Sequence, residues 1–252
     1  MATNNQLKGQ LDWVENMGSP LLLLDAATSF AKGRTIIRAN DSSTTAVDVG
    51  IAGGAVRLPM GGDDADTAQM YGPLAFEPDE SPTMWMQTRF RISDVSVASV
   101  FIGFTDQNSV SEMPIEDEGG ALGPDTPAAD AFGILLEGEQ DGTWQTVGEQ
   151  NSVPNTQAAS TNIPDLTDSE WTTVKVECSP ADSGSMRVWV DGVQLVTANT
   201  TSTKSFGNNV TTNFLRSSIV FAPVAAADDR NSAYNLDISE FGWSGSVGAG
   251  VD

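Results

Sequence analysis

The chain has 252 residues, and 12 Lys and Arg against 34 Asp and Glu give it a formal net charge of −22. Such a molecule repels phosphate groups, which excludes nucleic acid and anionic membrane surfaces as partners. Because the chain contains no His, nucleophile systems that use His and His-ligated zinc, copper or iron sites are excluded as well. No apolar stretch is long enough to span a membrane and the N-terminus lacks the layout of a secretory signal, so we expect a product made in the cytoplasm.

Residues 1–45 differ in pattern from the rest of the chain, and we interpret them as an N-terminal extended arm. Residues 11–18 predict a short helix that ends at Gly18, with Pro20 just beyond it. Burial of the four Leu side chains of Leu21–Leu24 would stabilise a contact by about 6–12 kcal/mol before entropy is counted. The arm therefore either covers the edge of the main domain or docks on another protein. Its candidate interface residues are Trp13, Val14, Met17, Leu21, Leu22, Leu23 and Leu24.

Residues 46–245 consist of short β runs divided by turn residues. Residues 84–92 alternate between apolar and polar positions, although Thr88 interrupts the apolar face. The runs 99–105 and 132–136 are apolar on both faces, which is typical of central strands that are covered on both sides. We predict an all-β fold, a two-sheet antiparallel jelly-roll sandwich.

The clearest pair of predicted strands lies between Trp171 and Val196, where Asp191-Gly192 is a strong hairpin turn. The residues that carry the pattern are Trp171, Val174, Val176, Gly184, Val188, Val190, Asp191, Gly192 and Val196. This spacing resembles the concanavalin A-like lectin/glucanase superfamily, which includes laminin-G-like domains. The resemblance implies a concanavalin A-like β-sandwich over residues 46–245 and leaves residues 246–252 as a flexible C-terminal tail.

Three further segments agree with this resemblance. Residues 86–92 and 101–106 look like the two adjacent strands that precede the variable loops, and residues 236–243 look like the closing strand. The same order of motifs, behind an arm without a signal sequence, resembles structural proteins of tailed phages that carry this jelly roll. That narrower resemblance implies a component of a virion.

The acidic residues do not form the pattern that catalysis on this fold needs. Glycoside hydrolases of the superfamily look like Glu-x-Asp-x-x-Glu on one strand, which aims the carboxylates into one cleft. This chain has no such run, and Glu116–Glu118 is contiguous, so a strand would send its side chains to opposite faces. We therefore assign no catalytic residue and predict that the protein is not an enzyme.

Two acidic turns were weighed as metal sites. Asp63, Asp64 and Asp66 offer oxygen ligands to Ca²⁺, but the spacing lacks the remaining ligands of a calcium loop, which favours a turn with solvated carboxylates. The same two interpretations apply to Asp228 and Asp229. No cofactor is predicted, and Ca²⁺ is the metal ion that stays open.

Two tryptophans are candidates for stacking on a sugar ring. Trp144 lies beside a predicted hairpin turn, and Trp189 lies on the face opposite Val188 and Val190. Such a Trp can equally pack under a covering loop or against a neighbouring subunit, and we keep both interpretations.

Two functions follow from these observations. We predict a non-enzymatic structural virion protein of a tailed phage, a capsid decoration protein or head appendage that is located in the virion. Its partners would be the major capsid protein, other virion proteins and sister copies in a homo-oligomer, bound through the arm and the sheet edges. The alternative is a carbohydrate-binding, lectin-like module that binds a glycan. A hydrolase is a third, weaker interpretation.

Overall fold

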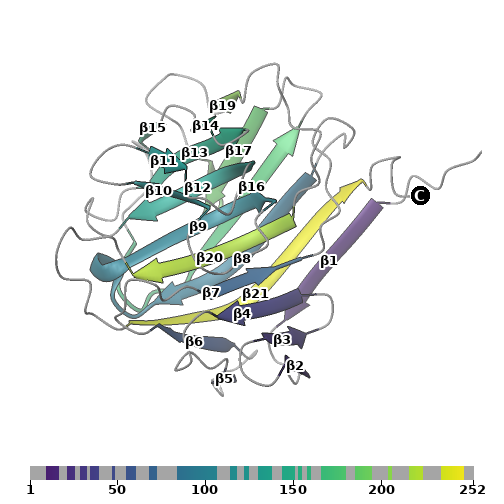
Figure 1. The fold of residues 1–252 in the computed structure, drawn as a ribbon, viewed down its shortest axis with the longest axis vertical. Helices are drawn as coiled ribbons and strands as arrows, with labels where there is room; N and C mark the ends of the chain where they lie inside the picture. Colours follow the sequence, from purple (N-terminus) through teal and green to yellow (C-terminus); the bar gives the residue numbers. More distant parts are fainter. Residues whose placement is uncertain are drawn as a thin grey trace, which may run out of the picture.

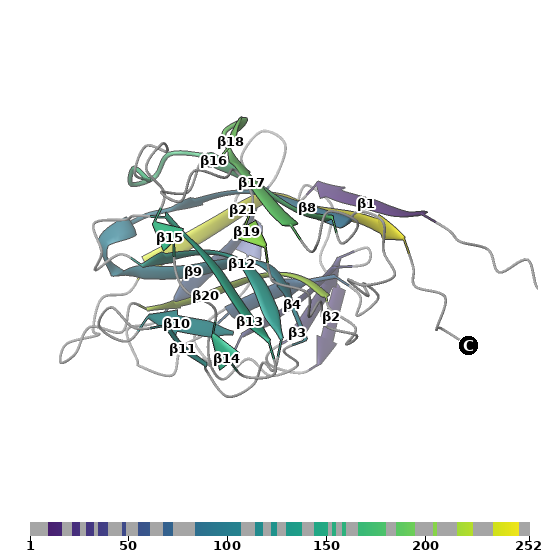
Figure 2. The ribbon, with the colours of Figure 1, turned by 90° about the horizontal axis from the view of Figure 1, so that it is seen from above.

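The structure is a computed structural model, and part of the chain is described in it. The described residues are 10–16, 22–25, 29–32, 35–39, 47–48, 55–60, 68–72, 84–106, 114–117, 122–124, 130–137, 144–150, 153–154, 158–159, 166–179, 185–194, 204–205, 216–223 and 234–246. Within this part the chain forms two large antiparallel sheets stacked face to face (Figures 1 and 2). The prediction of an all-β, two-sheet antiparallel jelly-roll sandwich is confirmed.

One sheet has nine strands in the described part of the chain. Its order across the sheet is β18 (Val193–Gln194), β17 (Ser185–Val190), β16 (Thr172–Ser179), β8 (Met84–Ile92), β21 (Tyr234–Ser246), β6 (Val56–Met60) and β5 (Val47–Asp48). In addition, β1 (Gln10–Asn16) pairs with β21, and β19 (Lys204–Ser205) pairs with β17.

The other sheet has ten described strands. Its order is β14 (Val153–Pro154), β13 (Trp144–Gln150), β12 (Ala131–Glu137), β9 (Ala98–Thr105), β20 (Arg216–Pro223), β7 (Ala68–Tyr71), β4 (Thr35–Ala39), β3 (Ser29–Lys32) and β2 (Leu22–Asp25), with β15 (Ala158–Ala159) on β13. A separate two-stranded ladder consists of β10 (Ile115–Asp117) and β11 (Leu122–Pro124). One turn of 3-10 helix, η1 (Val95–Val97), connects β8 to β9.

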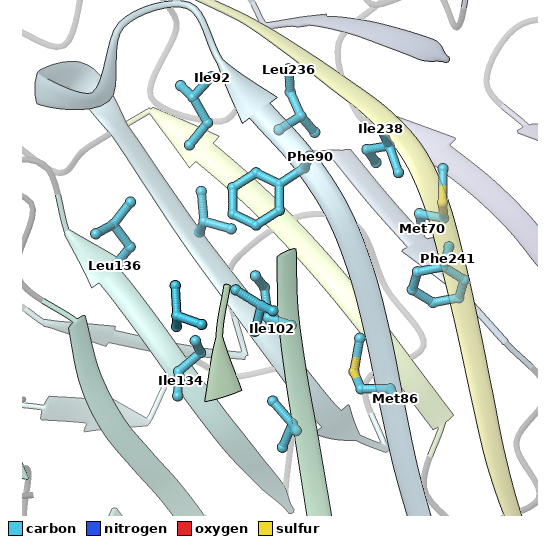
Figure 3. Packing of buried hydrophobic residues seen from close by; sticks show 14 of the residues in the cluster. Met70, Met86, Phe90, Ile92, Ile102, Ile134, Leu136, Leu236, Ile238 and Phe241 are labelled. Atoms are coloured by element: carbon cyan, nitrogen blue, oxygen red, sulfur yellow. The ribbon is translucent and has the colours of Figure 1, made fainter. Parts of the chain in front are cut away.

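The hydrophobic core lies between the two sheets and is filled by alternate residues of each strand (Figure 3). Members from the nine-stranded sheet include Met86, Phe90, Ile92, Leu236, Ile238 and Phe241. Members from the ten-stranded sheet include Met70, Ile102, Ile134 and Leu136. The two-residue period of a strand explains the set, since every second side chain of these runs is apolar.

The two sheets differ in what their other faces carry. In β9 every residue is buried, and so are residues 131–136 of β12, so the centre of the ten-stranded sheet is covered on both sides. The β10–β11 ladder packs against β12 and β13 on the side away from the nine-stranded sheet (Figure 2). In β8, by contrast, buried and partly exposed residues alternate over the whole strand. The nine-stranded sheet therefore has an outer face that solvent reaches.

A β-bulge in β21 explains the polar residue inside β8. The register between the two strands shifts between Ile238 and Glu240, and Ser239 is the extra residue. Because of the shift, Ile238 and Phe241 both face the core although they are three positions apart. The buried hydroxyl of Thr88 lies at this irregularity and donates a hydrogen bond of 3.1 Å to the carbonyl oxygen of Glu240. Thr88 thus satisfies a backbone group that the bulge leaves without a ladder partner.

The hairpin predicted at Asp191-Gly192 is confirmed. It joins β17 to β18, and both residues have positive φ angles, 48° and 79°, as a two-residue turn of this kind requires. The turn is also tied to the next strand, because the Asp191 N–H donates to the carbonyl oxygen of Thr173 at 2.8 Å. In return, the Thr173 N–H donates to Asp191 Oδ1 at 2.8 Å.

The helix predicted over residues 11–18 is wrong, because Gln10–Asn16 form the strand β1. Each residue of β1 has a partner on β21, and Trp13 lies opposite Trp243. A continuous ladder along a long strand supplies backbone hydrogen-bond partners, which overrides a weak local preference for a helix. Downstream of β1, Leu22–Asp25 form the strand β2.

The segment interpreted as an arm contributes strands to both sheets. Its strand β1 extends the nine-stranded sheet, while β2, β3 and β4 continue the ten-stranded sheet from β7. The described backbone of the arm pairs with strands of its own domain, which is the first of the two interpretations given above. Met17, Leu21 and the tail after Ser246 lie outside the described residues, as do the side chains of Trp13, Val14 and Leu22–Leu24.

Two glycines lie directly opposite each other on β9 and β12. A Cβ atom on Gly103 would press against the carbonyl oxygen of Phe132, and it would also meet the Cα atom of Gly133 at 2.7 Å and the Phe101 ring at 2.9 Å. Backbone atoms cannot move aside as a flexible side chain can. Gly103 therefore allows these two central strands to approach closely.

We expect Gly103→Ala to lower the free energy of unfolding by about 1–3 kcal/mol or more, because the added methyl group overpacks a rigid site. Denaturant unfolding measures the change. Gly192→Ala is the matched control: no atom lies within 4 Å of the added Cβ, so only its positive φ opposes the substitution, at a cost of about 1 kcal/mol. Equal effects of the two substitutions would contradict this account of Gly103.

Candidate functional site

The outer face of the nine-stranded sheet gathers aromatic and charged side chains. Strand β8 turns Trp85, Gln87, Arg89 and Arg91 outward, because the residues between them face the core. The neighbouring strands present residues at matching positions through their register. These are Arg57 on β6, Asp237 and Glu240 on β21, Trp171, Thr173, Lys175 and Glu177 along β16, and Arg187 and Trp189 on β17. We call this set the outer face.

Cations lie over the three tryptophans of the outer face. The Lys175 ammonium lies 4.9 Å from the ring centre of Trp189 and 5.6 Å from that of Trp85. The guanidinium groups of Arg89 and Arg91 lie 4.6 and 4.9 Å from the ring centre of Trp171. Each such contact stabilises the arrangement by about 0.5–2 kcal/mol, depending on how far solvent is excluded. The indoles are therefore held in defined positions.

At one end of the outer face, Asp237 joins three strands. Arg57 donates to both of its carboxylate oxygens, from Nε at 2.7 Å and from Nη2 at 2.9 Å. Arg91 donates to Oδ2 from Nε at 2.8 Å, and its Nη2 lies 2.7 Å from the same atom. The Asp237 side chain is 3% exposed, whereas those of Arg57 and Arg91 are 35% and 27% exposed.

The two arginines determine the protonation state of Asp237. Burial by itself raises the pKa of this carboxyl, but the hydrogen bonds from Arg57 and Arg91 and their positive charges outweigh burial and hold the pKa below its usual range. The hydrogen bond to Asp237 likewise raises the pKa of Arg57 above its usual value. Asp237 is therefore ionised at neutral pH and cannot serve as a proton donor there.

A second carboxylate is shared in the same way at the other end of the outer face. Lys175 donates to Glu177 Oε2 at 3.0 Å, and Arg187 Nη1 lies 3.7 Å from Glu177 Oε1. Between these two clusters, Gln87 donates to Glu240 Oε1 at 2.7 Å. The charged groups of the outer face are thus arranged as hydrogen-bonded sets across neighbouring strands.

Beside Asp237 the surface is hollowed by a cavity of about 120 Å³. Its lining residues are Arg57, Arg91, Ser93, Ser169, Asn235 and Asp237. The hollow lies where β8 ends and β21 begins, next to the outer face at Trp171. All six lining residues have polar side chains, which suits a ligand that forms hydrogen bonds.

The structure brings together only part of the site predicted from the sequence. Trp189 lies on the outer face, as predicted, together with Trp85 and Trp171, which the sequence interpretation missed. The alternating pattern of their strands could have placed Trp85 and Trp171 on an outward face. That they share this face with Trp189 depends on the register between the strands, which the sequence does not reveal. Trp144 lies on the other sheet, opposite Leu136, and its side chain is outside the described residues.

The predicted metal sites remain predictions. Asp63, Asp64, Asp66, Asp228 and Asp229 lie outside the described residues. In the described ranges, no group of three or more His, Cys, Asp or Glu residues is placed to hold a metal ion. The same ranges contain no helix with the length and apolar character needed to cross a membrane.

No family model matches the chain, and no curated protein matches its sequence. Solved structures do match. A protein of unknown function from Shewanella oneidensis MR-1 has a TM-score of 0.62 at 13% identity, over 96% of this chain and 89% of that chain. The carbohydrate recognition domain of Emp47p has a TM-score of 0.51 at 14% identity, over 91% and 94% of the two chains. The β-glucanase of Bacillus licheniformis has a TM-score of 0.51 at 13% identity, over 96% and 99%.

The Emp47p domain and the β-glucanase are concanavalin A-like lectin and glucanase jelly rolls, and the chain has this jelly-roll fold, as the sequence resemblance predicts. At such low identities the likeness shows the fold alone. The neighbours include carbohydrate-binding domains as well as enzymes, so the fold is compatible with both classes. None of the three descriptions concerns a phage, and the virion role, its partners and its location stay predictions from the sequence.

We expect Asp237→Asn to lower the free energy of unfolding at pH 7 by about 1–3 kcal/mol, after allowance for solvent around the two arginines. Because folding lowers the pKa of Asp237, its contribution is present above the unfolded pKa of about 4 and is lost as the pH falls through the folded pKa. The difference between wild type and variant should therefore shrink below about pH 4. Denaturant unfolding at neutral and acidic pH measures it.

The matched control for this experiment is Glu170→Gln, which removes an exposed carboxylate near the same end of the outer face. We expect the control to change the free energy of unfolding by less than about 0.5 kcal/mol at either pH. A difference between wild type and Asp237→Asn that did not depend on pH would contradict the role assigned to the carboxylate.

Proposed function

We propose that the protein is a lectin-like carbohydrate-binding module and that its outer face binds the glycan. The observation that carries this proposal is the presence of Trp85, Trp171 and Trp189 on one solvent-accessible sheet face, each beside groups that form hydrogen bonds. Aromatic rings offer a flat apolar surface to the C–H face of a sugar. Neighbouring Arg, Lys and Gln side chains donate hydrogen bonds to its hydroxyl groups.

The cation contacts support binding in a second way. A ligand that meets side chains already held in place loses less entropy on binding than one that must order them. Lys175 holds the indoles of Trp85 and Trp189, and its flexible, 33% exposed side chain still has N–H groups to donate. The neighbouring solved structure of a carbohydrate recognition domain agrees with the proposal at the level of the fold.

The proposal keeps the prediction that the protein is not an enzyme. Glycoside hydrolysis needs one carboxyl group that stays protonated and a second that is ionised, at a fixed separation. On the outer face, Asp237 is held ionised by two arginines, and Glu177 is shared by two cations. A carboxylate that is held ionised, as Asp237 is, fixes neighbouring side chains and does not donate a proton.

We expect the wild-type protein to bind neutral glycans on an array, and Trp189→Ala and Trp171→Ala each to weaken that binding at least about tenfold, or ~1.4 kcal/mol. The comparison is run with and without Ca²⁺, because a calcium requirement is still open. Trp144→Ala, on the other sheet, is the matched control and should retain affinity. Circular dichroism confirms that the variants are folded.

An array without hits in either condition would overturn the proposed function. Loss of binding in Trp144→Ala alone would move the binding site to the ten-stranded sheet. Cleavage of a bound oligosaccharide, followed by chromatography of the products, would overturn the prediction that the protein is not an enzyme.

A further inference from the structure

The hollow beside Asp237 has a rim that is fixed by backbone hydrogen bonds. The Ser169 N–H donates to the carbonyl oxygen of Ile92 at 2.6 Å, and the Val95 N–H donates to Asp168 Oδ1 at 2.8 Å. On the other side, Asn235 and Ser93 exchange two bonds, from Asn235 N–H to Ser93 Oγ at 2.8 Å and from Ser93 N–H to the Asn235 carbonyl oxygen at 2.9 Å. The wall is therefore formed before any ligand arrives.

Backbone strain is stored in the same wall. Ser169 has a φ of 61°, and the other described non-glycine residue with a positive φ is Asp191 in the hairpin turn. Asp191 is explained by its turn type, whereas Ser169 is held in place by its bond to Ile92. A strained residue that is fixed by its surroundings and lines a cavity is a recurrent feature of ligand sites.

The hollow offers more hydrogen-bond donors than its own carboxylate uses. The contacts with Asp237 involve Nε and Nη2 of both Arg57 and Arg91, and no Nη1 contact is found among the described residues. The side-chain amide of Asn235 and the hydroxyl proton of Ser93 add further donors, and Asn235 also adds an acceptor. This set matches the mixed donors and acceptors of sugar hydroxyl groups.

The charges around the hollow favour a neutral ligand. Arg57, Arg91 and Asp237 give the lining a formal charge of +2 − 1 = +1. The carboxylates of Asp94, Asp168 and Glu170 flank the rim, and the chain as a whole carries −22. An anionic sugar would be repelled by this surrounding field, whereas a neutral polyol would not.

The position of the hollow points to the end of a glycan. Ser93 and Ser169 line the hollow on the side where β8 ends. On the other side, Arg91 of the lining contacts Trp171, which Arg89 also contacts, and Trp171 belongs to the outer face. With a volume of about 120 Å³, the hollow is too small for a whole oligosaccharide. The remaining sugars would extend across Trp171 toward Lys175.

We propose that this hollow captures the terminal sugar of a neutral glycan through its hydroxyl groups, with Arg57, Arg91 and Asn235 as the residues that recognise it. The inference rests on the proposed function and adds the ligand class and the direction of binding. Because a site built to hydrogen-bond hydroxyl groups leaves polar groups unpaired when one is missing, it should discriminate strongly against altered chain ends.

Calorimetry with cellotetraose, laminaritetraose and mannotetraose tests the proposal. For the tightest of these probes, oxidation of one terminal residue to an acid should weaken binding at least about tenfold, while the same change at the opposite end has a smaller effect. Arg57→Lys keeps the charge opposite Asp237 but removes the fork of donors, and should weaken binding about tenfold. Arg216→Lys, on strand β20 of the other sheet, is the matched control and should stay within about twofold.

Asn235→Asp provides a second variant of nearly the same shape, which adds a negative charge to the hollow and should also weaken binding about tenfold. Binding that depends on Trp171 but is unchanged by acidic termini, Arg57→Lys and Asn235→Asp would overturn this inference and leave the proposed function intact. Equal losses in Arg57→Lys and Arg216→Lys would overturn it too. Absence of binding to all three tetrasaccharides would overturn the inference, and a glycan array without hits would remove the proposed function with it.

Discussion

The register among β21, β8, β16 and β17 is the constraint on which the rest of the structure depends. Residues 84–90 of β8 have partners on both sides, so Met86 lies beside Val176 in the core while Gln87 lies beside Lys175 outside. The side-chain period of a strand is two residues, and a slip of one residue would exchange the two sets entirely. The buried face specifies this register, since the slipped arrangement would bury arginines and expose the hydrophobic core. The outer face is in this sense a consequence of the core.

Electrostatics divides the molecule into two regions. The chain as a whole is strongly negative, yet the outer face holds Arg57, Arg89, Arg91, Lys175 and Arg187 and few carboxylates. Asp237 and Glu177 each contact cations from two strands. These charges therefore fix the positions of side chains and do not serve to create a long-range field. An outer face with fixed donors and aromatic rings, on an acidic protein, is consistent with the proposed recognition of neutral, hydroxyl-rich molecules.

The sequence predicts those parts of the fold that follow from local pattern. The alternation of residues 84–92, the hairpin at Asp191-Gly192 and the doubly covered strands 99–105 and 132–136 are all found in the structure. The helix predicted over residues 11–18 fails because its true partner, β21, lies at the other end of the chain. Pairing between distant segments decides such a case, and a local pattern does not contain that information.

The candidate site was less accessible to sequence reasoning for the same reason. Arg57 and Asp237 are separated by 180 positions, and only the order β8–β21–β6 brings them together. Trp189 was identified because it alternates with Val188 and Val190 in a clear hairpin. Trp85 and Trp171 share its face, but their proximity depends on the register between strands that are far apart in sequence.

The bulge at Ser239 has a consequence for how the chain tolerates change in length. On either side of it, inward positions fall on even numbers at Leu236 and Ile238 and on odd numbers at Phe241 and Trp243. Losing Ser239 itself would restore a uniform two-residue period and keep Ile238, Phe241 and Trp243 on the core face. A single-residue deletion is therefore expected to survive evolution at the bulge, whereas an insertion in the regular part of β21 would turn the residues beyond it inside out.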